Sequence, residues 1–309
     1  MNEFELIRTH FQRDPLNPSV VLGVGDDAAI ISQLSDYETV ISVDSVVAGR
    51  HVPQICPPDG FAARLLGRGL SDLAAMGADP KYVLLSLTLP TFEPGWVDHF
   101  ADRFHKLCVR FGLDLVGGDT SKGPLSAHIT VIGHVPKGSA ISRSGLRSGD
   151  DLWLFGPDLG GARAYLDVLD GLESNHEVWA ERYWRPEPQL VAGLSLRGMA
   201  RAMIDISDGL CQDLFHLLDN SVGSATVKLQ SNLIPLCDDL VDRFGSEKAM
   251  EYALTGGDDY YLLASIPPGL EVPECGRRIG MVVKGDSARI LLDGKPLPSK
   301  WELGWDHSR

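Results

Sequence analysis

Aspartates beside glycine or serine recur at six places in the chain, and they are the residues best suited to chemistry. Each lies where a predicted strand ends or a predicted helix begins. The motifs are Gly25-Asp26-Asp27, Ser42-Val43-Asp44-Ser45, Leu70-Ser71-Asp72-Leu73, Gly117-Gly118-Asp119-Thr120, Asp205-Ile206-Ser207-Asp208-Gly209 and Gly256-Gly257-Asp258-Asp259. One such motif is ordinary turn or helix-cap chemistry. Six together predict carboxylates that converge and need a hard cation such as Mg²⁺.

Asp72 is the sharpest case, because it lies on the apolar face of a predicted helix. Phe61, Leu65 and Met76 share that face at helical spacing. A solvated helix keeps its carboxylates on the opposite face. Asp72 is therefore either a metal ligand or the partner of Arg68 in an i, i+4 ion pair. The metal ligand is the favoured interpretation.

Several common catalytic motifs are absent from the sequence: the P-loop, the H-x-x-x-H zinc helix, the protein-kinase signature and the G-x-S-x-G elbow. Residues 23–28, GVGDDA, superficially match a dinucleotide fingerprint, but their two aspartates would repel a pyrophosphate. His128 and His134 can share a strand face, where packing or ordinary hydrogen bonding is expected. A carboxylate and Mg²⁺ site with glycine-rich approaches remains, and it suits phosphoryl transfer. An acceptor that is itself a phosphate needs no general base.

The apolar residues alternate between helical and strand periods, which predicts an α/β or α+β fold. Helices are expected near residues 4–11, 58–77, 96–111, 160–170, 175–184, 189–202 and 208–219. Strands are expected near 40–43, 82–89, 113–116, 127–135, 152–155, 203–206, 225–229, 260–266, 278–283 and 288–292, the first of them buried. The segment 136–150 is rich in Gly, Ser and basic residues and is the best candidate for a domain boundary.

Length and charge limit the class of protein. A chain of 309 residues predicts two domains. The net charge of −14, from 28 basic and 42 acidic residues, argues against binding to nucleic acid or to an anionic membrane. No apolar run is long enough for a membrane helix, and the start lacks a signal core. Five scattered cysteines predict reduced thiols, so we expect a cytoplasmic enzyme.

Seven motifs, in order and spacing, resemble the thiamine-monophosphate kinase family: GVGDDAAI, ISVDSVVAGRH, LSDLAAMGADP, LVGGDTSKGP, SRSG, IDISDGL and LTGGDDYYLL. The resemblance runs from about residue 20 to residue 265, with a weaker echo at 301–307. It implies a two-domain fold like that of aminoimidazole ribonucleotide synthetase. Residues 1–137 would bind ATP and Mg²⁺ and pair through their sheet in a homodimer. Residues 150–309 would form an α/β sandwich domain that completes the active site.

The resemblance implies direct in-line transfer of the ATP γ-phosphate to thiamine phosphate, giving thiamine diphosphate and ADP, with no catalytic general base. Several Mg²⁺ ions would be held by Asp27, Ser42, Val43, Asp44, Asp72, Asp119, Asp205 and Asp208. ATP would be contacted by Gly118, Asp119, Arg143 and Ser207. Thiamine phosphate would be contacted by His51, Asp258 and Trp305. Without the resemblance, a surface or packing role would be the expectation for Arg143, His51 and Trp305.

Three positions depart from the family pattern. Val43 replaces the usual Thr before Asp44, so only its backbone carbonyl can coordinate an ion. Asp258 replaces the usual Glu and is one methylene shorter, while Gly69 stands where Asn is usual. Two alternatives to the kinase stay open. One is another ATP-dependent synthetase of the same superfamily, and the other is a member that binds Mg²⁺ and nucleotide without catalysis.

Overall fold

The computed structural model describes residues 3–24, 28–171, 177–220, 225–285, 289–299 and 301. The chain forms two compact units. The first consists of residues 1–73 and 78–138, and the second consists of residues 74–77 and 139–309. The predictions for Asp27 and Trp305 fall outside the described residues.

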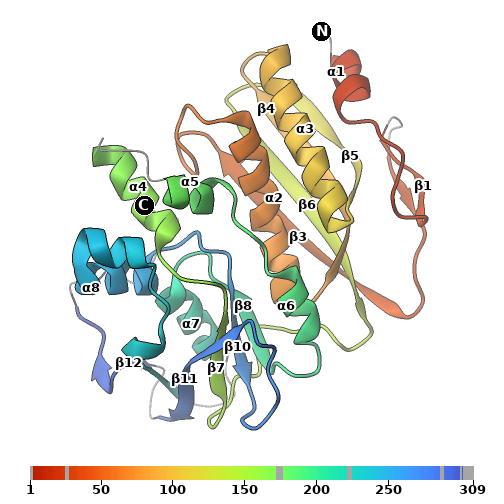
Figure 1. The fold of residues 1–309 in the computed structure, drawn as a ribbon. Helices are drawn as coiled ribbons and strands as arrows, with labels where there is room; N and C mark the ends of the chain where they lie inside the picture. The colour runs from red at the N-terminus through yellow and green to blue at the C-terminus, as the bar shows by residue number, and fades with distance from the viewer. Residues whose placement is uncertain are drawn as a thin grey trace. The chain divides into compact units, whose positions relative to one another are not determined.

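The first unit is built on a four-stranded sheet with the strand order β3-β6-β4-β5 (Figure 1). β4 and β5 are parallel, and the other neighbouring pairs are antiparallel. The strands are β3 (Tyr37–Val47), β4 (Asp79–Leu89), β5 (Asp114–Lys122) and β6 (Ser126–Pro136), and a separate antiparallel pair is formed by β1 (Val20–Leu22) and β2 (Ile30–Ile31). The helices are α1 (Glu3–His10), α2 (Pro58–Ala75) and α3 (Pro94–Phe111).

One face of this sheet is covered by α2 and α3 (Figure 1). The apolar faces predicted for both helices supply the core, with Phe61 and Leu65 from α2 and Phe100 and Phe104 from α3 all fully buried. α2 packs closely against β6 at Gly69. A Cβ at this position would lie 2.7 Å from the Cδ1 atom of Ile129. Glycine at position 69 is therefore explained by helix–sheet packing.

The other face of the sheet is open along β3. Ile41 is 62% exposed and Val43 is 65% exposed. The strand predicted around residues 40–43 is present, but the prediction that it is buried is wrong. β3 is an edge strand, and only its alternate residues meet the helices. The apolar side chains of Ile41 and Val43 are therefore exposed to solvent in the single chain.

The second unit is built on a seven-stranded sheet with the order β13-β12-β9-β11-β7-β10-β8. The strands are β7 (Asp151–Phe155), β8 (Ala202–Asp205), β9 (Ala225–Leu229), β10 (Leu262–Ile266), β11 (Gly276–Lys284), β12 (Arg289–Leu292) and β13 (Lys295–Pro296). The helices are α4 (Gly161–Gly171), α5 (Glu177–Trp184), α6 (Leu190–Ser195), α7 (Leu210–Asp219) and α8 (Asp238–Thr255), with a short 3₁₀ turn η1 (Ser231–Leu233). Leu210, Leu214 and Leu217 of α7 pack into the core of this sheet.

Two helix predictions need correction. The helix expected over 189–202 ends at Ser195, and Gly198 then adopts a left-handed conformation with φ of 73°. Glycine leaves a helix at such a position without steric cost. α8 was not predicted at all. Half of its residues are charged or polar, and Gly245 inside it has a non-helical φ of 78°.

The structure also describes the cysteines and the apolar character of the helices. Cys56, Cys108, Cys211, Cys237 and Cys275 are all free thiols. Among the helices of the described residues, none is long and apolar enough to cross a membrane.

Candidate active site

In the first unit, Ser42 and Asp72 meet across the contact between β3 and α2. The Ser42 hydroxyl donates a hydrogen bond of 2.5 Å to Oδ2 of Asp72. Ser42 pairs in register with Val131 and Asp44 with Ile129, which places both on the helix-covered face. Val43 alternates to the open face, so its side chain is directed away from this group. Only the Val43 carbonyl can contribute there.

Asp44 is held by Arg68, one turn before Asp72 on α2. Nε of Arg68 donates to Oδ2 of Asp44 at 3.0 Å, and its Nη2 donates to Oδ1 at 3.1 Å. Both side chains are largely buried. The sequence suggested Arg68 as a partner of Asp72, and the structure shows that Arg68 forms a two-pronged ion pair with Asp44. A cation therefore already sits beside this carboxylate.

Asp119 lies at the opposite edge of the same sheet. The residue before it on β5, Gly118, pairs with Leu85 of β4. Leu85 pairs with Ile129 of β6, and Ile129 pairs with Asp44 of β3, so the four residues form one row across the sheet. Three strand spacings separate the edges, or about 14 Å. Mg²⁺ binds oxygen at about 2.1 Å, so one ion cannot join Asp44 and Asp119. The first unit does not bring these two carboxylates together.

Gly118 is required by the sheet itself. A Cβ at this position would lie 1.8 Å from the Leu85 carbonyl oxygen of the neighbouring strand. β5 also carries a bulge beside this site, where the register shifts between Val83 and Leu84 of β4. The glycine therefore lets β5 pair with β4 just before Asp119, which is exposed.

The two histidines of β6 and His51 have ordinary roles in the single chain. Nδ1 of His128 lies 2.6 Å from the Ser45 hydroxyl, and His134 is buried against the rings of Tyr37 and Tyr82. The packing and hydrogen-bonding roles expected for His128 and His134 are confirmed. Nδ1 of His51 accepts the Val47 N–H at 3.1 Å in the turn after β3.

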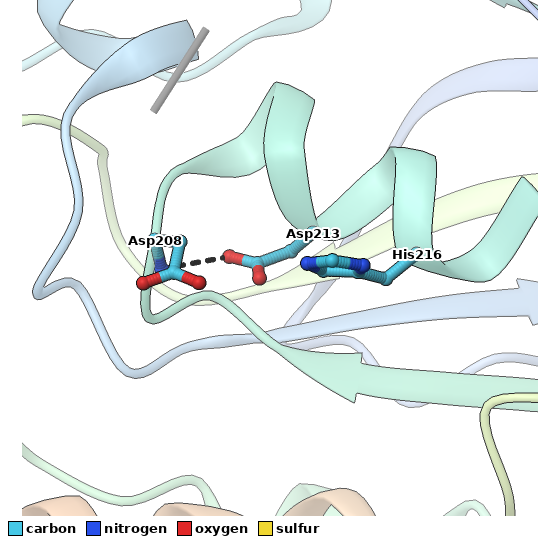
Figure 2. A group of neighbouring side chains, drawn as sticks. All are labelled: Asp208, Asp213 and His216. Carbon is cyan, nitrogen blue, oxygen red and sulfur yellow. Dashed lines mark hydrogen bonds between the residues drawn. The ribbon is translucent and has the colours of Figure 1, made fainter. Parts of the chain in front are cut away.

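In the second unit, Asp205 ends β8, and Ser207 and Asp208 lie on the short loop that leads from β8 to α7. Asp205 is 3% exposed. Figure 2 shows Asp208 beside Asp213 and His216 of α7. One ligand atom from each of these three residues lies within 4.8 Å of the others. Arg143 is exposed in the segment of the chain that joins β6 to β7.

The electrostatics of this loop favour a cation. Burial, with the nearby carboxylates of Asp205 and Asp208, raises the pKa of Asp213 from 3.8 to about 8. Repulsion among neighbouring carboxylates is relieved when a divalent ion binds between them. The oxygen donors of Asp205 and Asp208 are of the kind that Mg²⁺ prefers. The residues present therefore fit a magnesium site.

The Asp258 segment is joined to this loop and reaches a cavity. Asp258 and Tyr260 have left-handed φ values of 70° and 55°, and the Tyr260 hydroxyl donates to Oδ1 of Asp258 at 2.7 Å. A cavity of about 610 Å³ lies beside α5. It is lined by Pro157, Glu177, Val178, Glu181, Arg182, Arg185, Pro186, Glu187, Gln189, Asp258, Asp259 and Tyr261. Carboxylates outnumber guanidinium groups in this lining.

Arg182 and Asp259 shape the base of the cavity. Arg182 donates to the hydroxyl of Tyr261 and to the carboxylate of Asp158, both at 2.6 Å. Burial raises the pKa of Asp259 well above the usual carboxyl value. Its carboxyl group also accepts a hydrogen bond from the Gly160 N–H, which ties the motif to the start of α4.

Sequence reasoning missed Arg68 as the partner of Asp44, and it missed Asp213. A signal for Asp213 was present. It lies in the apolar stretch of α7 that contains Leu210, Leu214 and Leu217, as Asp72 lies on the apolar face of α2. A carboxylate in such a position is buried and must be hydrogen-bonded. Asp213 met the same criterion that singled out Asp72.

Comparisons with known proteins find relatives over almost the full chain. The family model described as AIR synthase related protein, N-terminal domain, matches residues 25–135. The thiamine-monophosphate kinase of Haemophilus influenzae is 36% identical over 323 residues, covering 99% of this chain and 98% of that protein. The crystal structure of the Stenotrophomonas maltophilia enzyme of the same name superposes with a TM-score of 0.82 at 32% identity, covering 91% of this chain and 93% of that chain.

A second solved structure carries ligands. It is described as AaThiL complexed with AMPPCP and TMP, and it superposes with a TM-score of 0.80 at 28% identity. The match covers 92% of this chain and 91% of that chain. The full-length similarity and the shared mixed α/β fold lead to one assignment. The chain belongs to the thiamine-monophosphate kinase family.

Proposed function

We propose that this protein transfers the γ-phosphate of ATP directly to thiamine phosphate, giving thiamine diphosphate and ADP, as a cytoplasmic enzyme. The observation that carries the proposal is the relationship over 99% of the chain to a thiamine-monophosphate kinase at 36% identity. The solved complex of a relative with AMPPCP and TMP supports the choice of both substrates. The same relationship argues against a different synthetase of the superfamily.

The aspartates of both units are proposed to hold several Mg²⁺ ions. In the first unit they would be bound by Ser42, the Val43 carbonyl, Asp44, Asp72 and Asp119, together with Asp27. In the second unit they would be bound by Asp205 and Asp208. The edge-to-edge separation of Asp44 and Asp119 supports more than one ion in the first unit alone. Bound magnesium would neutralise phosphate charge and stabilise the charge that moves during transfer.

The chain's own residues are proposed to position the substrates. Gly118, Asp119, Arg143 and Ser207 would contact ATP, with the Arg143 guanidinium suited to phosphate oxygens. The acceptor is a phosphate oxygen that is already ionised near neutral pH. No side chain has to remove a proton from it, and in-line placement of the two phosphates supplies much of the rate.

The cavity beside α5 is proposed to bind thiamine phosphate. Its wall holds Asp258, and its surplus of carboxylates suits a positively charged thiazolium ring. The Tyr260 hydroxyl fixes one oxygen of Asp258, so the shorter side chain is held at a defined place. His51 and Trp305 would complete the contacts to the substrate.

The protein is also proposed to act as a homodimer. Residues 1–137 would bind ATP and Mg²⁺ and pair through the open face of the β3-β6-β4-β5 sheet, and residues 150–309 would complete the active site. The exposure of Ile41 and Val43 supports this pairing, since adjacent apolar side chains on a sheet face gain by burial.

The direct test is incubation with ATP, Mg²⁺ and thiamine phosphate, followed by detection of thiamine diphosphate. Asp44→Asn and Asp72→Asn are expected to abolish turnover while the far-ultraviolet circular dichroism stays native. The absence of product from the wild-type protein would reject the proposed reaction. Near-normal turnover by either variant would reject the ligand role of that aspartate.

A further inference from the structure

Asp213 ties down the loop between β8 and α7. Its Oδ2 atom accepts hydrogen bonds from three consecutive backbone N–H groups, those of Ser207 at 3.0 Å, Asp208 at 3.1 Å and Gly209 at 3.1 Å. The Asp213 N–H donates in turn to the Gly209 carbonyl at 3.0 Å. Asp213 is 2% exposed. The loop therefore closes around one buried carboxylate oxygen (Figure 2).

This arrangement decides which groups of the loop can meet a ligand. Successive N–H groups that point to one place form the concave site that binds phosphate in many proteins. Here the chain supplies its own acceptor, the Oδ2 atom of Asp213, so the three amides are engaged internally. A ligand meets the side chains of the loop, namely the Ser207 hydroxyl and the Asp208 carboxylate. Those groups suit a cation or a hydrogen-bond donor better than a bare phosphate.

The same loop is bonded to the segment that carries Asp258. The Asp258 N–H donates to the Ser207 carbonyl, and the Tyr260 N–H donates to the Ile206 carbonyl, both at 2.8 Å. A Cβ at Gly257 would lie 2.4 Å from the Ser207 carbonyl oxygen, so the two backbones are in direct contact. A shift of Ser207 therefore moves Asp258 as well.

We infer that Asp213 is a positioning residue for two parts of the proposed site, the loop between β8 and α7 and the segment that carries Asp258. It fixes the backbone from which Ser207 and Asp208 project and, through Ser207, the place of Asp258. The inference rests on the roles given to these three residues under the proposed function. It assigns Asp213 no contact with a substrate or an ion, because its task is to accept the three amide hydrogen bonds.

The test compares Asp213→Asn and Asp213→Ala with the control Asp219→Asn. Asn keeps a carbonyl oxygen that can accept the amide hydrogen bonds but cannot ionise, and Ala removes the acceptor. Asp219 is an exposed aspartate at the end of the same helix. The full-length protein is used throughout, without metal for hydrogen exchange and with Mg²⁺, ATP and thiamine phosphate for kinetics.

Hydrogen exchange of the peptide that contains residues 207–209 reports the three bonds directly. In the wild-type protein and in Asp219→Asn these amides are expected to be protected. Exchange is expected to be a few-fold faster in Asp213→Asn and about 100-fold faster in Asp213→Ala, because the opening of the loop no longer breaks three bonds. Exchange in the wild-type protein as fast as in an open loop overturns the inference.

The kinetics separate positioning from a purely structural role and from direct ion binding. Misplaced Asp208 and Asp258 raise the Mg²⁺ half-saturation and the KM for thiamine phosphate together, with about a 100-fold loss of kcat/KM for Asp213→Ala. Asp213→Asn is expected to lose less than about 10-fold, since it keeps the acceptor. If Asp213 only stabilised the fold, its substitution would reduce the fraction of folded, active protein. The apparent kcat would then fall, while the Mg²⁺ half-saturation and the KM for thiamine phosphate would stay unchanged.

Wild-type kinetics in a folded Asp213→Ala variant overturn the inference. Half-saturation values that stay unchanged in both Asp213→Asn and Asp213→Ala overturn it as well. An Asp213→Asn variant as inactive as Asp213→Ala also overturns it, because that result would mark Asp213 as a metal ligand. If Asp213→Ala does not fold, the graded effects of Asp213→Asn on exchange and on both half-saturation values decide. Wild-type protein that forms no thiamine diphosphate, or full turnover by Asp208→Asn, contradicts the proposed function instead. The exchange result at residues 207–209 does not depend on either outcome.

Discussion

At the scale of single residues, the partner of each aspartate decides what the aspartate can do. Removing one carboxylate from a cluster of like charges would be expected to stabilise a metal-free protein. For Asp44 that expectation no longer holds, because Arg68 already neutralises it. Substitution of Asp44 would remove a two-pronged ion pair from a largely buried guanidinium, which costs stability. Clustered carboxylates in a sequence do not reveal which of them already has a cation.

The Arg68 pair makes a testable prediction for Arg68→Gln. In EDTA the variant is expected to lose about 1 to 2 kcal/mol of unfolding free energy, since the pair is partly buried and two-pronged. In saturating Mg²⁺ the loss should shrink, because an ion at Asp44 would supply the missing positive charge. Denaturant titrations in both conditions measure the difference.

Lys106→Gln is the matched control, because it breaks a surface ion pair with Asp102. Its effect should be below about 0.5 kcal/mol in either condition. An equal loss for Arg68→Gln with and without Mg²⁺ would contradict the proposed ion at Asp44.

At the scale of elements, small structural details place the chemical groups. β5 can pair with β4 before Asp119 only because position 118 has no Cβ. Gly118→Ala is expected to destabilise the protein by about 3 kcal/mol or more, since the new methyl group meets backbone that cannot move aside. The control Gly95→Ala in α3 has open space around the added atom and should change stability by less than about 0.5 kcal/mol. Denaturant unfolding of both variants measures this, and equal stabilities would count against the β4–β5 pairing.

The contact between α1 and α3 carries a pH dependence. His105 lies 2.6 Å from the His10 carbonyl, and burial lowers its pKa from 6.5. The native state then binds fewer protons than the unfolded state, so stability rises with pH. The contribution is full above pH 6.5 and is lost as the pH falls through 6.5 towards the lowered pKa.

His105→Gln keeps a hydrogen-bond donor and removes the titrating group. Its unfolding free energy is expected to fall less steeply than that of the wild-type protein between about pH 7.5 and about pH 5.5. His99→Gln, at an exposed position of the same helix, serves as the control and should follow the wild-type curve. Parallel curves for His105→Gln and the wild-type protein would refute the assignment.

At the scale of the whole molecule, the two units divide the aspartates between them. Ser42, Asp44, Asp72 and Asp119 belong to the first unit, and Asp205, Asp208 and Asp258 belong to the second. Asp44 and Asp119 lie on opposite edges of one sheet, so one ion cannot bind both of them. The open face of that sheet is the surface proposed to pair in the homodimer.

Ile41→Glu tests that pairing. Ile41 is 62% exposed on the open face. A charged side chain buried at this position in the proposed interface would oppose association. The variant is expected to be monomeric by sedimentation at a concentration where the wild-type protein is dimeric. Val109→Glu, at a position 66% exposed on α3, should remain dimeric. A dimeric Ile41→Glu would exclude this face as the interface.

The sequence alone predicted the helices and strands whose apolar period is strong. α3 shows why: its apolar residues recur at helical spacing, and Gly112 ends it with φ of 68°. α8 escaped prediction because tertiary contacts, rather than an apolar stripe, hold a helix interrupted at Gly245. The end of α6 depended on the conformation of Gly198, which a period cannot show.

For the site, the sequence by itself determined which residue types are available and, through seven ordered motifs, the family to which they belong. Those properties are local, because they depend on neighbours along the chain. Only the tertiary structure decided that Arg68 pairs with Asp44, that Asp119 lies across the sheet, and that Asp213 accepts three amides of its loop. Each is a contact or a separation between segments whose register and burial are set by packing, which spacing along the chain does not encode.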